Sequence, residues 1–155
     1  MLRKRTSQIV QEKTRLFAKN VVLLFRHMKK HRVSTIATQF LRSGTSIGAN
    51  IAEGRYAQSP SDALAKYYIA QKEAAETLYW LELFKDSGAL AGAKKFSNLH
   101  EDCKELLNLL ERLISLAKAA KSRKKASLLK ERSARRGRKN LSPKKSVKSK
   151  KPKKG

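Results

Sequence analysis

Apolar residues recur every three or four positions through four separate segments of this chain, and this spacing constrains the fold more than any other feature of the sequence. A period near 3.6 places such residues on one side of an α-helix, whereas a half-buried strand would alternate at every second residue. No β-rich segment competes with this pattern. Because the breaks between the segments are short, the sequence predicts an all-α fold, an antiparallel up-down-up-down four-helix bundle.

The expected helices cover about residues 7–30, 34–53, 60–86 and 99–117. Ser7 is the predicted N-cap of the first helix. Ser59, followed by Pro60 and by Asp62 three residues after the cap, gives the clearest helix start in the chain. Gly54 is predicted to end the second helix, and Gly88 and Gly92 to form the turn after the third.

Each expected helix has an apolar or small-residue face that should pack in the core. The second helix should have a wide face made of two rows, in which Gly44 and Gly48 allow a neighbouring backbone to come close. The faces are Val10, Phe17, Val21, Leu24 and Met28; Ile36, Phe40, Ser43, Ile47, Asn50 and Gly54 with Val33, Ala37, Leu41, Gly44, Gly48 and Ile51; Leu64, Tyr67, Tyr68, Gln71, Ala74, Ala75, Leu78 and Leu81; and Leu99, Cys103, Leu106, Leu110, Leu113 and Ala117.

Charge divides the chain into two parts. Of its 37 Lys and Arg and 12 Asp and Glu residues, 17 bases and one acid fall in residues 121–155, which leaves a net charge of +9 on residues 1–120 and +16 on the remainder. We therefore predict a bundle over 1–120 and a Lys/Arg-rich, largely disordered tail over 121–155, in which the fourth helix frays toward Arg135. Such a tail favours polyanionic partners.

Nucleic acid, RNA or DNA, is the polyanion that we expect the tail to bind, mainly through phosphate contacts and counterion release. The element Ser142-Pro143-Lys144-Lys145 resembles a motif of linker-histone tails, although a solvated polycation, in which the order of the residues hardly matters, is the favoured explanation. Binding through the surface of an anionic membrane is a further alternative. The predicted contact residues are Lys124, Lys125, Arg135, Arg136, Arg138, Lys139, Lys144, Lys145, Lys148, Lys150, Lys151, Lys153 and Lys154.

Residues 41–54 carry the sequence "LRSGTSIGANIAEG". This stretch resembles the second-helix signature of the four-helix bundle proteins also called the 23S ribosomal-RNA intervening-sequence protein family, through Leu41-Arg42, Ser46-Ile47 and the run from Ala49 to Gly54. The likeness extends over about residues 7–118 and includes "AETLYWLEL" in the third helix. The chain departs from the family at Gly48, where proline is common, and in having only Asp62 among the acids that often begin the third helix.

The resemblance implies a four-helix bundle without established enzymatic activity and a homopentameric assembly. One branch of the family, the accessory proteins of diversity-generating retroelements, implies a basic barrel that binds nucleic acid and a reverse transcriptase. We accordingly expect a non-enzymatic, oligomeric nucleic-acid-binding protein, with a reverse transcriptase as a candidate partner. The alternative is a protein-interaction scaffold whose bundle docks a partner and whose tail serves localisation or solubility.

Candidate catalytic and metal-binding groups are sparse. His27 and His31 have the spacing of a shared metal site, but the neighbouring bases favour a basic helix end. Cys103 lies in a core row beside His100, which argues against a Cys–His nucleophile. No catalytic residue, metal or cofactor is therefore expected. A single cysteine and the lack of a long apolar run predict a soluble, cytoplasmic chain.

Two groups of residues in the bundle remain open to more than one interpretation. Arg42, Asn50 and Glu53 are predicted to form a structural polar network that fixes the register of the second helix, because a buried unpaired amide would cost about 1–3 kcal/mol. A catalytic role for them is the less favoured alternative. The aromatic residues of the third helix are expected in the core or in a subunit interface rather than as base-stacking platforms; they are Tyr67, Tyr68, Tyr79, Trp80 and Phe84.

Overall fold

The computed structural model describes residues 2–30, 35–90 and 93–140, and the chain divides into two units, residues 1–121 and 122–155. The division lies one residue from the change in composition between residues 120 and 121. The first unit holds the hydrophobic core. His31, Val33 and Gly92 lie outside the described residues, as do Ser142 and all that follow it.

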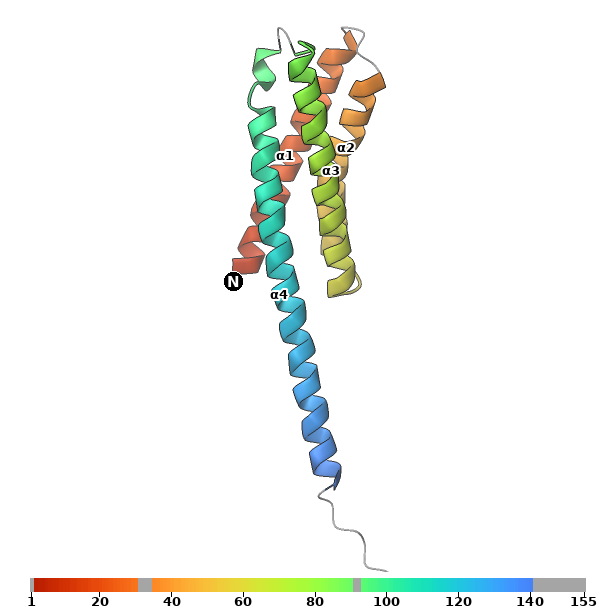
Figure 1. Ribbon diagram of the computed structural model, residues 1–155, viewed down its shortest axis with the longest axis vertical. Helices are drawn as coiled ribbons and strands as arrows, with labels where there is room; N and C mark the ends of the chain where they lie inside the picture. Colours follow the sequence, from red (N-terminus) through yellow and green to blue (C-terminus); the bar gives the residue numbers. More distant parts are fainter. Residues whose placement is uncertain (1, 31–34, 91–92, 141–155) are drawn as a thin grey trace, which may run out of the picture. The chain divides into compact units, whose positions relative to one another are not determined.

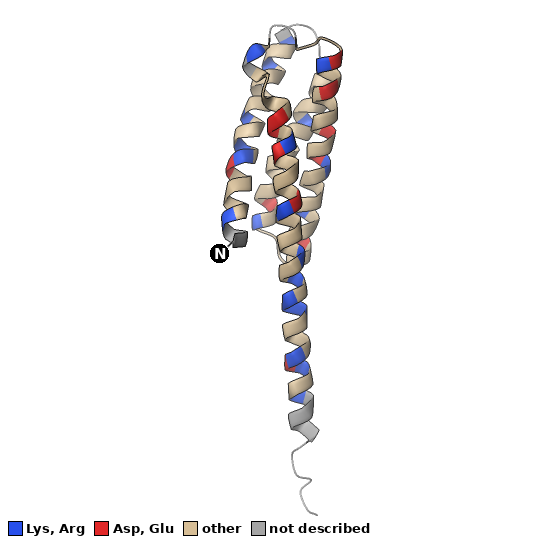
Figure 2. Cartoon of the chain, turned by 60° about the vertical axis from the view of Figure 1, so that its left-hand side comes forward, with Lys and Arg blue, Asp and Glu red and all other residues tan. Residues whose placement is uncertain are grey.

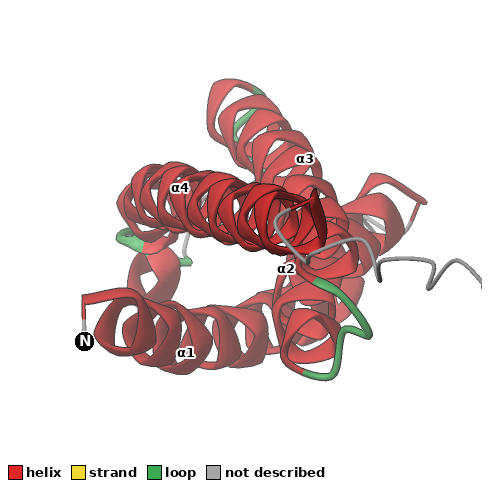
Figure 3. Cartoon of the chain, turned by 90° about the horizontal axis from the view of Figure 1, so that it is seen from below, coloured by secondary structure: helices red, strands yellow, loops and turns green. Residues whose placement is uncertain are grey.

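Four helices form a bundle in the first unit (Figure 1). They are α1 (Leu2–Lys30), α2 (Thr35–Arg55), α3 (Pro60–Asp86) and the first part of α4 (Leu99–Asn140), with a short 3₁₀ helix, η1 (Lys94–Phe96), before α4. Successive helices run in opposite directions, and an end-on view shows them around a common centre (Figure 3). This is the predicted bundle. No helix in the described ranges has an apolar stretch long enough to cross a lipid bilayer.

Side chains from all four helices fill the core, and every residue of the predicted rows in α1 and α4 is buried. The rings of Phe40 on α2 and Phe84 on α3 meet edge to face, with their centroids 5.5 Å apart. Aromatic pairs favour this arrangement because the positive edge of one ring meets the negative face of the other. The 3.6-residue period therefore identified the core sides of α1 and α4 correctly.

The buried side of α3 differs from the prediction. Tyr68 and Ala75 were expected in the core and are exposed, whereas Ala70 and Thr77 are buried. On α2, Ile36 is likewise exposed rather than buried. The reason is the close packing of α2 against α3, which leaves room for small residues on the facing side of α3 and turns the large tyrosine outward.

Two glycines of α2 make close packing with its neighbours achievable. A Cβ atom on Gly44 would lie 2.8 Å from both Cγ atoms of Val21 on α1, and a Cβ on Gly54 would lie 2.5 Å from Cε1 of Tyr67 on α3. Real Cβ atoms do not approach other atoms so closely. Gly54 was predicted to end α2, but the helix continues to Arg55, and the residue instead allows the contact with the tyrosine ring.

The ends of the helices agree with the sequence in part. The side chain of Ser59 accepts a hydrogen bond from the backbone N–H of Asp62 at 3.1 Å, as predicted for an N-cap, and Asp62 Oδ2 accepts one from the N–H of Gln58 at 3.1 Å. Gly88 has the positive φ of 69° that a turn after α3 requires. The prediction of Ser7 as an N-cap was wrong, since α1 already begins at Leu2.

Candidate nucleic-acid interface

The basic part of the chain begins as a helix. α4 continues without a break through residues 122–140, five residues beyond the predicted end near Arg135. Ala, Leu, Lys, Arg and Glu dominate this stretch, and these residues have the highest helix propensities. The described part of the predicted tail, residues 121–140, is therefore α-helical, and the remainder of that tail lies outside the described residues.

Basic side chains cover the described part of this helix. Every residue from 122 to 135 is exposed, and Glu131 is the only acid among them. The cartoon coloured by charge shows Lys and Arg repeated along the segment (Figure 2). With so little compensating charge, the segment presents a dense positive potential to solvent. The exposed bases are Arg123, Lys124, Lys125, Lys130, Arg132 and Arg135.

Three of the predicted contact residues, Lys124, Lys125 and Arg135, are exposed on this helix. Arg123, Lys130 and Arg132 were missed, although they belong to the same run of sequence and have the same exposure. The backbone of Arg136, Arg138 and Lys139 is helical, but their side chains lie outside the description. The remaining predicted contacts also lie outside the described residues; they are Lys144, Lys145, Lys148, Lys150, Lys151, Lys153 and Lys154.

The structure does not bring Arg42, Asn50 and Glu53 together in one polar network. Asn50 Nδ2 donates to the backbone oxygen of Ser46 at 2.9 Å, within its own helix. Glu53 pairs with Lys66 on α3, with 2.5 Å between Oε2 and Nζ, and this pair raises the pKa of Lys66. Arg42 lies eight residues before Asn50 and eleven before Glu53, about 12 and 16 Å away along the axis of α2. Each of the three side chains therefore has contacts of its own.

Arg42 is exposed and its charge acts on Glu73 of α3. The pKa of Glu73 is raised, mainly because burial disfavours its charged form and because Glu76 lies nearby, while Arg42 acts in the opposite direction. Long-range attraction of this kind across partly exposed groups is weak and is screened by salt. It links α2 to α3 without a direct bond.

A buried hydroxyl pair that the sequence analysis missed joins α2 to α3. The Oγ atoms of Ser43 and Thr77 lie 3.0 Å apart and share a hydrogen bond, and both residues are fully buried. Thr77 Oγ1 also lies 2.7 Å from the backbone oxygen of Glu73. The signal was the presence of Ser43 in the apolar row of α2, because a buried hydroxyl needs a partner.

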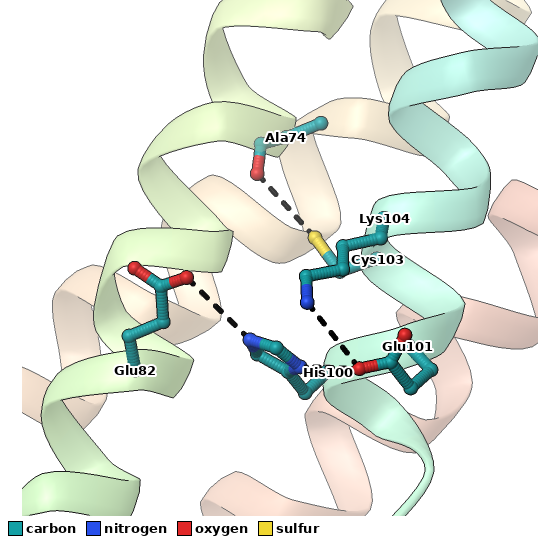
Figure 4. A network of polar contacts seen from close by, with 6 residues as sticks. All are labelled: Ala74, Glu82, His100, Glu101, Cys103 and Lys104. Atoms are coloured by element: carbon teal, nitrogen blue, oxygen red, sulfur yellow. Dashed lines mark hydrogen bonds and ion pairs between the residues drawn. The ribbon is translucent and has the colours of Figure 1, made fainter.

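His100 and Cys103 do not form a nucleophilic pair (Figure 4). The Cys103 thiol donates to the backbone oxygen of Ala74 at 3.4 Å, while His100 Nε2 lies 3.5 Å from Glu82 Oε1. Burial, with smaller contributions from Asp102 and Glu82, raises the pKa of the Cys103 thiol to about 12. Because the thiolate is the reactive form, this cysteine is unreactive at neutral pH.

The histidine and aromatic candidates also have defined surroundings. The His27 ring lies 6.2 Å from the ring of Phe96, and no group of three or more His, Cys, Asp or Glu residues in the described chain could hold a metal ion.

Among the aromatic residues of α3, Phe84 is buried and cannot stack on bases. Tyr79 is 57% exposed and meets Trp80 edge to face, with 5.0 Å between centroids. Tyr68 has Lys118 Nζ over its ring at 5.2 Å.

Comparison with known proteins identifies a matching family and a similar solved structure. A family model described as 23S rRNA-intervening sequence protein matches residues 6–112. A solved structure of a protein of unknown function from the S23 ribosomal protein family of Bacteroides thetaiotaomicron VPI-5482 is 37% identical, with a TM-score of 0.66. The alignment covers 71% of this chain and 98% of the other. No curated protein matches the chain significantly.

Proposed function

The chain belongs to the 23S rRNA-intervening sequence protein family, and on this premise we propose that it is a non-enzymatic, oligomeric protein that binds RNA or DNA through the phosphate backbone. The single observation that supports this most is the exposed helix of residues 122–135, with its six bases and one acid. At about 1.5 Å per residue these charges extend over roughly 20 Å. A duplex offers one phosphate charge for about every 1.7 Å of its axis, so the helix can face several phosphates at once.

Salt dependence tests the mechanism of this binding. Each phosphate contact that releases a counterion contributes about −0.9 to the slope of log affinity against log salt, so six contacts give a slope of about −5. Between 50 and 200 mM salt the affinity should then fall by roughly 10³-fold. Fluorescence anisotropy with labelled oligonucleotides measures the slope. Affinity that does not change with salt would contradict the proposal.

The location of the site is tested by removing charge in the full-length chain. Changing Lys125, Lys130 and Arg132 to Gln should reduce the salt slope by about 3, since three contacts are lost. The matched control changes Lys19, Arg26 and Lys85 to Gln, which removes the same charge from exposed positions of the bundle. Equal losses in the two triple variants would mean that the whole basic surface binds, rather than the helix of residues 122–135.

A chain that ends at Lys121 provides a second test. The first unit contains the complete core, so the truncated chain should keep its helical signal and its cooperative unfolding. We expect it to lose most of its affinity for nucleic acid. Full affinity in the truncated chain would place the binding surface in the bundle and contradict the assignment to the tail.

The oligomeric part of the proposal is supported by an exposed groove between α1 and α2. Leu16 on its rim is 59% exposed, and Gly48, Ala49 and Ala52 line it with small side chains. Its volume is about 770 Å³. A large exposed leucine beside small residues fits a second copy of the chain, and the family resemblance suggests a pentamer. An oligomer would bring several basic helices together and raise the avidity for a long polyanion.

Sedimentation equilibrium tests this assembly. The Leu16→Lys variant should have a lower molar mass in solution than the wild-type chain, because a charge in the interface disfavours association. Ile69→Lys makes the same change at an exposed apolar position on α3 and serves as the control. A monomeric wild-type chain, or an unchanged mass for the Leu16 variant, would contradict self-association through this groove.

We also propose a protein partner, for which an enzyme acting on nucleic acid, such as a reverse transcriptase, is the first candidate. Exposed apolar and aromatic residues on α3, namely Tyr68, Ile69 and Tyr79, support a docking surface there. The same surface supports the alternative of a scaffold without nucleic-acid binding. A pull-down from nuclease-treated lysate separates the two, since a partner of a scaffold survives the treatment and a partner bridged by nucleic acid does not.

A further inference from the structure

Helical periodicity sorts the side chains of residues 122–135 into distinct rows. Successive residues are rotated by about 100° around the axis, so residues that are three, four or seven apart lie on the same side. All these residues are exposed, so each row is accessible. One side has the small or apolar row Ser122, Ala126, Leu129 and Ser133; two basic rows flank it, Lys125 and Arg132 on one flank and Arg123 and Lys130 on the other.

The only acid of the segment is on the outer side of the helix. Glu131 projects about 170° away from the centre of the small-residue row, and Lys124, seven residues before it, and Arg135, four residues after it, lie on the same outer side. A single orientation therefore turns the acid away from a polyanion while it directs both basic rows toward phosphates. This orientation places the small-residue row between the two lines of charge.

In B-form duplex DNA, two phosphate backbones border the major groove, and the space between them is about as wide as an α-helix. Its major groove is about 12 Å wide and admits an α-helix, whose diameter with side chains is about 10–12 Å. The deep, narrow major groove of A-form RNA does not admit a helix, and a single strand offers only one line of phosphates. We propose that residues 122–135 bind in the major groove of B-form duplex DNA, with both basic rows on the phosphates.

The residues that face the groove floor in this orientation have suitable chemistry. The Ser133 hydroxyl donates to the backbone oxygen of Lys130 at 2.8 Å, which leaves its lone pairs free to accept from an exocyclic amine of adenine or cytosine. Leu129 is 56% exposed and offers an apolar contact to a thymine methyl group. Ser122 and Ala126 are short enough to let the helix approach the bases. The inference rests on the proposed function and narrows its ligand to one form of nucleic acid.

Two neighbouring substitutions of equal charge provide the test. Ala126→Glu places a carboxylate on the row that faces the bases, whereas Ser127→Glu places one between a basic flank and the outer side. Both change the net charge by the same amount and both introduce a good helix former. Each full-length variant is titrated against a duplex DNA of about 16 base pairs at 150 mM salt, with circular dichroism to confirm that the helical content is retained.

Ala126→Glu should weaken duplex DNA binding by about tenfold or more, an effect as large as that of a lost base-pair contact. Ser127→Glu should weaken it by less than about fivefold, since it removes the equivalent of one phosphate contact. The wild-type chain should bind duplex DNA more tightly than duplex RNA or single strands of the same length. It should also protect guanine N7, in the major groove, from dimethyl sulfate while adenine N3, in the minor groove, stays reactive.

Equal losses in the two variants, or equal affinity for duplex DNA and duplex RNA, would overturn the groove assignment while leaving nucleic-acid binding intact. Protection of adenine N3 without protection of guanine N7 would overturn it in the same way. A chain that binds neither duplex DNA, duplex RNA, single-stranded DNA nor single-stranded RNA would overturn the proposed function and the groove assignment together. The outcomes therefore separate a wrong ligand from a wrong function.

Discussion

Replacing Gly44 by alanine tests the packing of α1 against α2, and Gly48→Ala is its matched control one helical turn away. The new Cβ at residue 44 would lie 2.8 Å from both Cγ atoms of Val21, which is fully buried and β-branched and therefore has little freedom to rotate. A Cβ at residue 48 would lie 3.5 Å from the backbone oxygen of Thr14, an ordinary contact. The two variants add the same methyl group to the same helix in different surroundings.

The expected magnitudes follow from two opposing effects. Alanine in place of an interior helical glycine stabilises by about 1 kcal/mol, and this gain is shared by both variants. Overpacking of a filled core costs about 1–3 kcal/mol and applies only at residue 44. Gly48→Ala should therefore raise the free energy of unfolding by up to about 1 kcal/mol. Gly44→Ala should be about 1–3 kcal/mol less stable than that control.

Urea titration followed by far-ultraviolet circular dichroism measures this difference. Because Gly48 also lines the groove proposed for self-association, the titration is repeated at several protein concentrations, and the comparison uses the range in which the midpoint is constant. A Gly44→Ala variant as stable as Gly48→Ala would refute the argument. It would mean that α1 and α2 are farther apart, or that Val21 moves at little cost.

Two further predictions concern buried polar groups. Thr77→Val should lower the free energy of unfolding by about 1–3 kcal/mol, because it removes the hydroxyl that donates to Ser43 Oγ and leaves Ser43 only its 3.4 Å contact with the backbone oxygen of Phe40. Adding Ser43→Ala should restore part of the loss, and additive losses in a urea-monitored double-mutant cycle would contradict the pairing. The raised pKa of Cys103, about 12, means that folding favours the protonated thiol. The contribution of Cys103 to the free energy of unfolding should thus be fully present below the ordinary thiol pKa near 9 and should fall as the pH rises toward 12. A thiol reagent at neutral pH should modify Cys103 only after unfolding. Rapid modification of the native chain would show that the thiol is accessible.

The sequence predicted the bundle and the core rows of α1 and α4 because their apolar residues are large and strictly periodic. It failed on α3, where Tyr68 competes with Ala70 for the buried side and only the closeness of α2 decides between them. It also failed at Asn50, whose amide is satisfied within its own helix by Ser46. Hydrogen bonds that depend on side-chain direction are not determined by periodicity.

The sequence predicted the positive charge of the candidate interface but not its helical conformation. Composition identified Lys124, Lys125 and Arg135, yet no apolar row marks residues 122–140 as a helix, since Leu128 and Leu129 have no periodic partners. Intrinsic propensity alone favours the helix there, and propensity is a weak guide in sequence reading. The positions of Arg123 and Lys130 on a separate side could be recognised only once the backbone was known to be helical.

The continuity of α4 has a thermodynamic consequence for binding. A separate peptide of residues 122–140 would have to form a first helical turn in water, and that turn is costly. In the intact chain α4 is already formed in the bundle, and residues 122–140 extend it. Fixing the backbone of a flexible segment costs about 1–2 kcal/mol per residue, and a polycation that folds on binding bears that cost at the moment of association. A helix extended from a folded bundle is largely ordered beforehand, so more of its electrostatic attraction remains as affinity. A free peptide of the same residues should for this reason bind a polyanion more weakly than the intact chain.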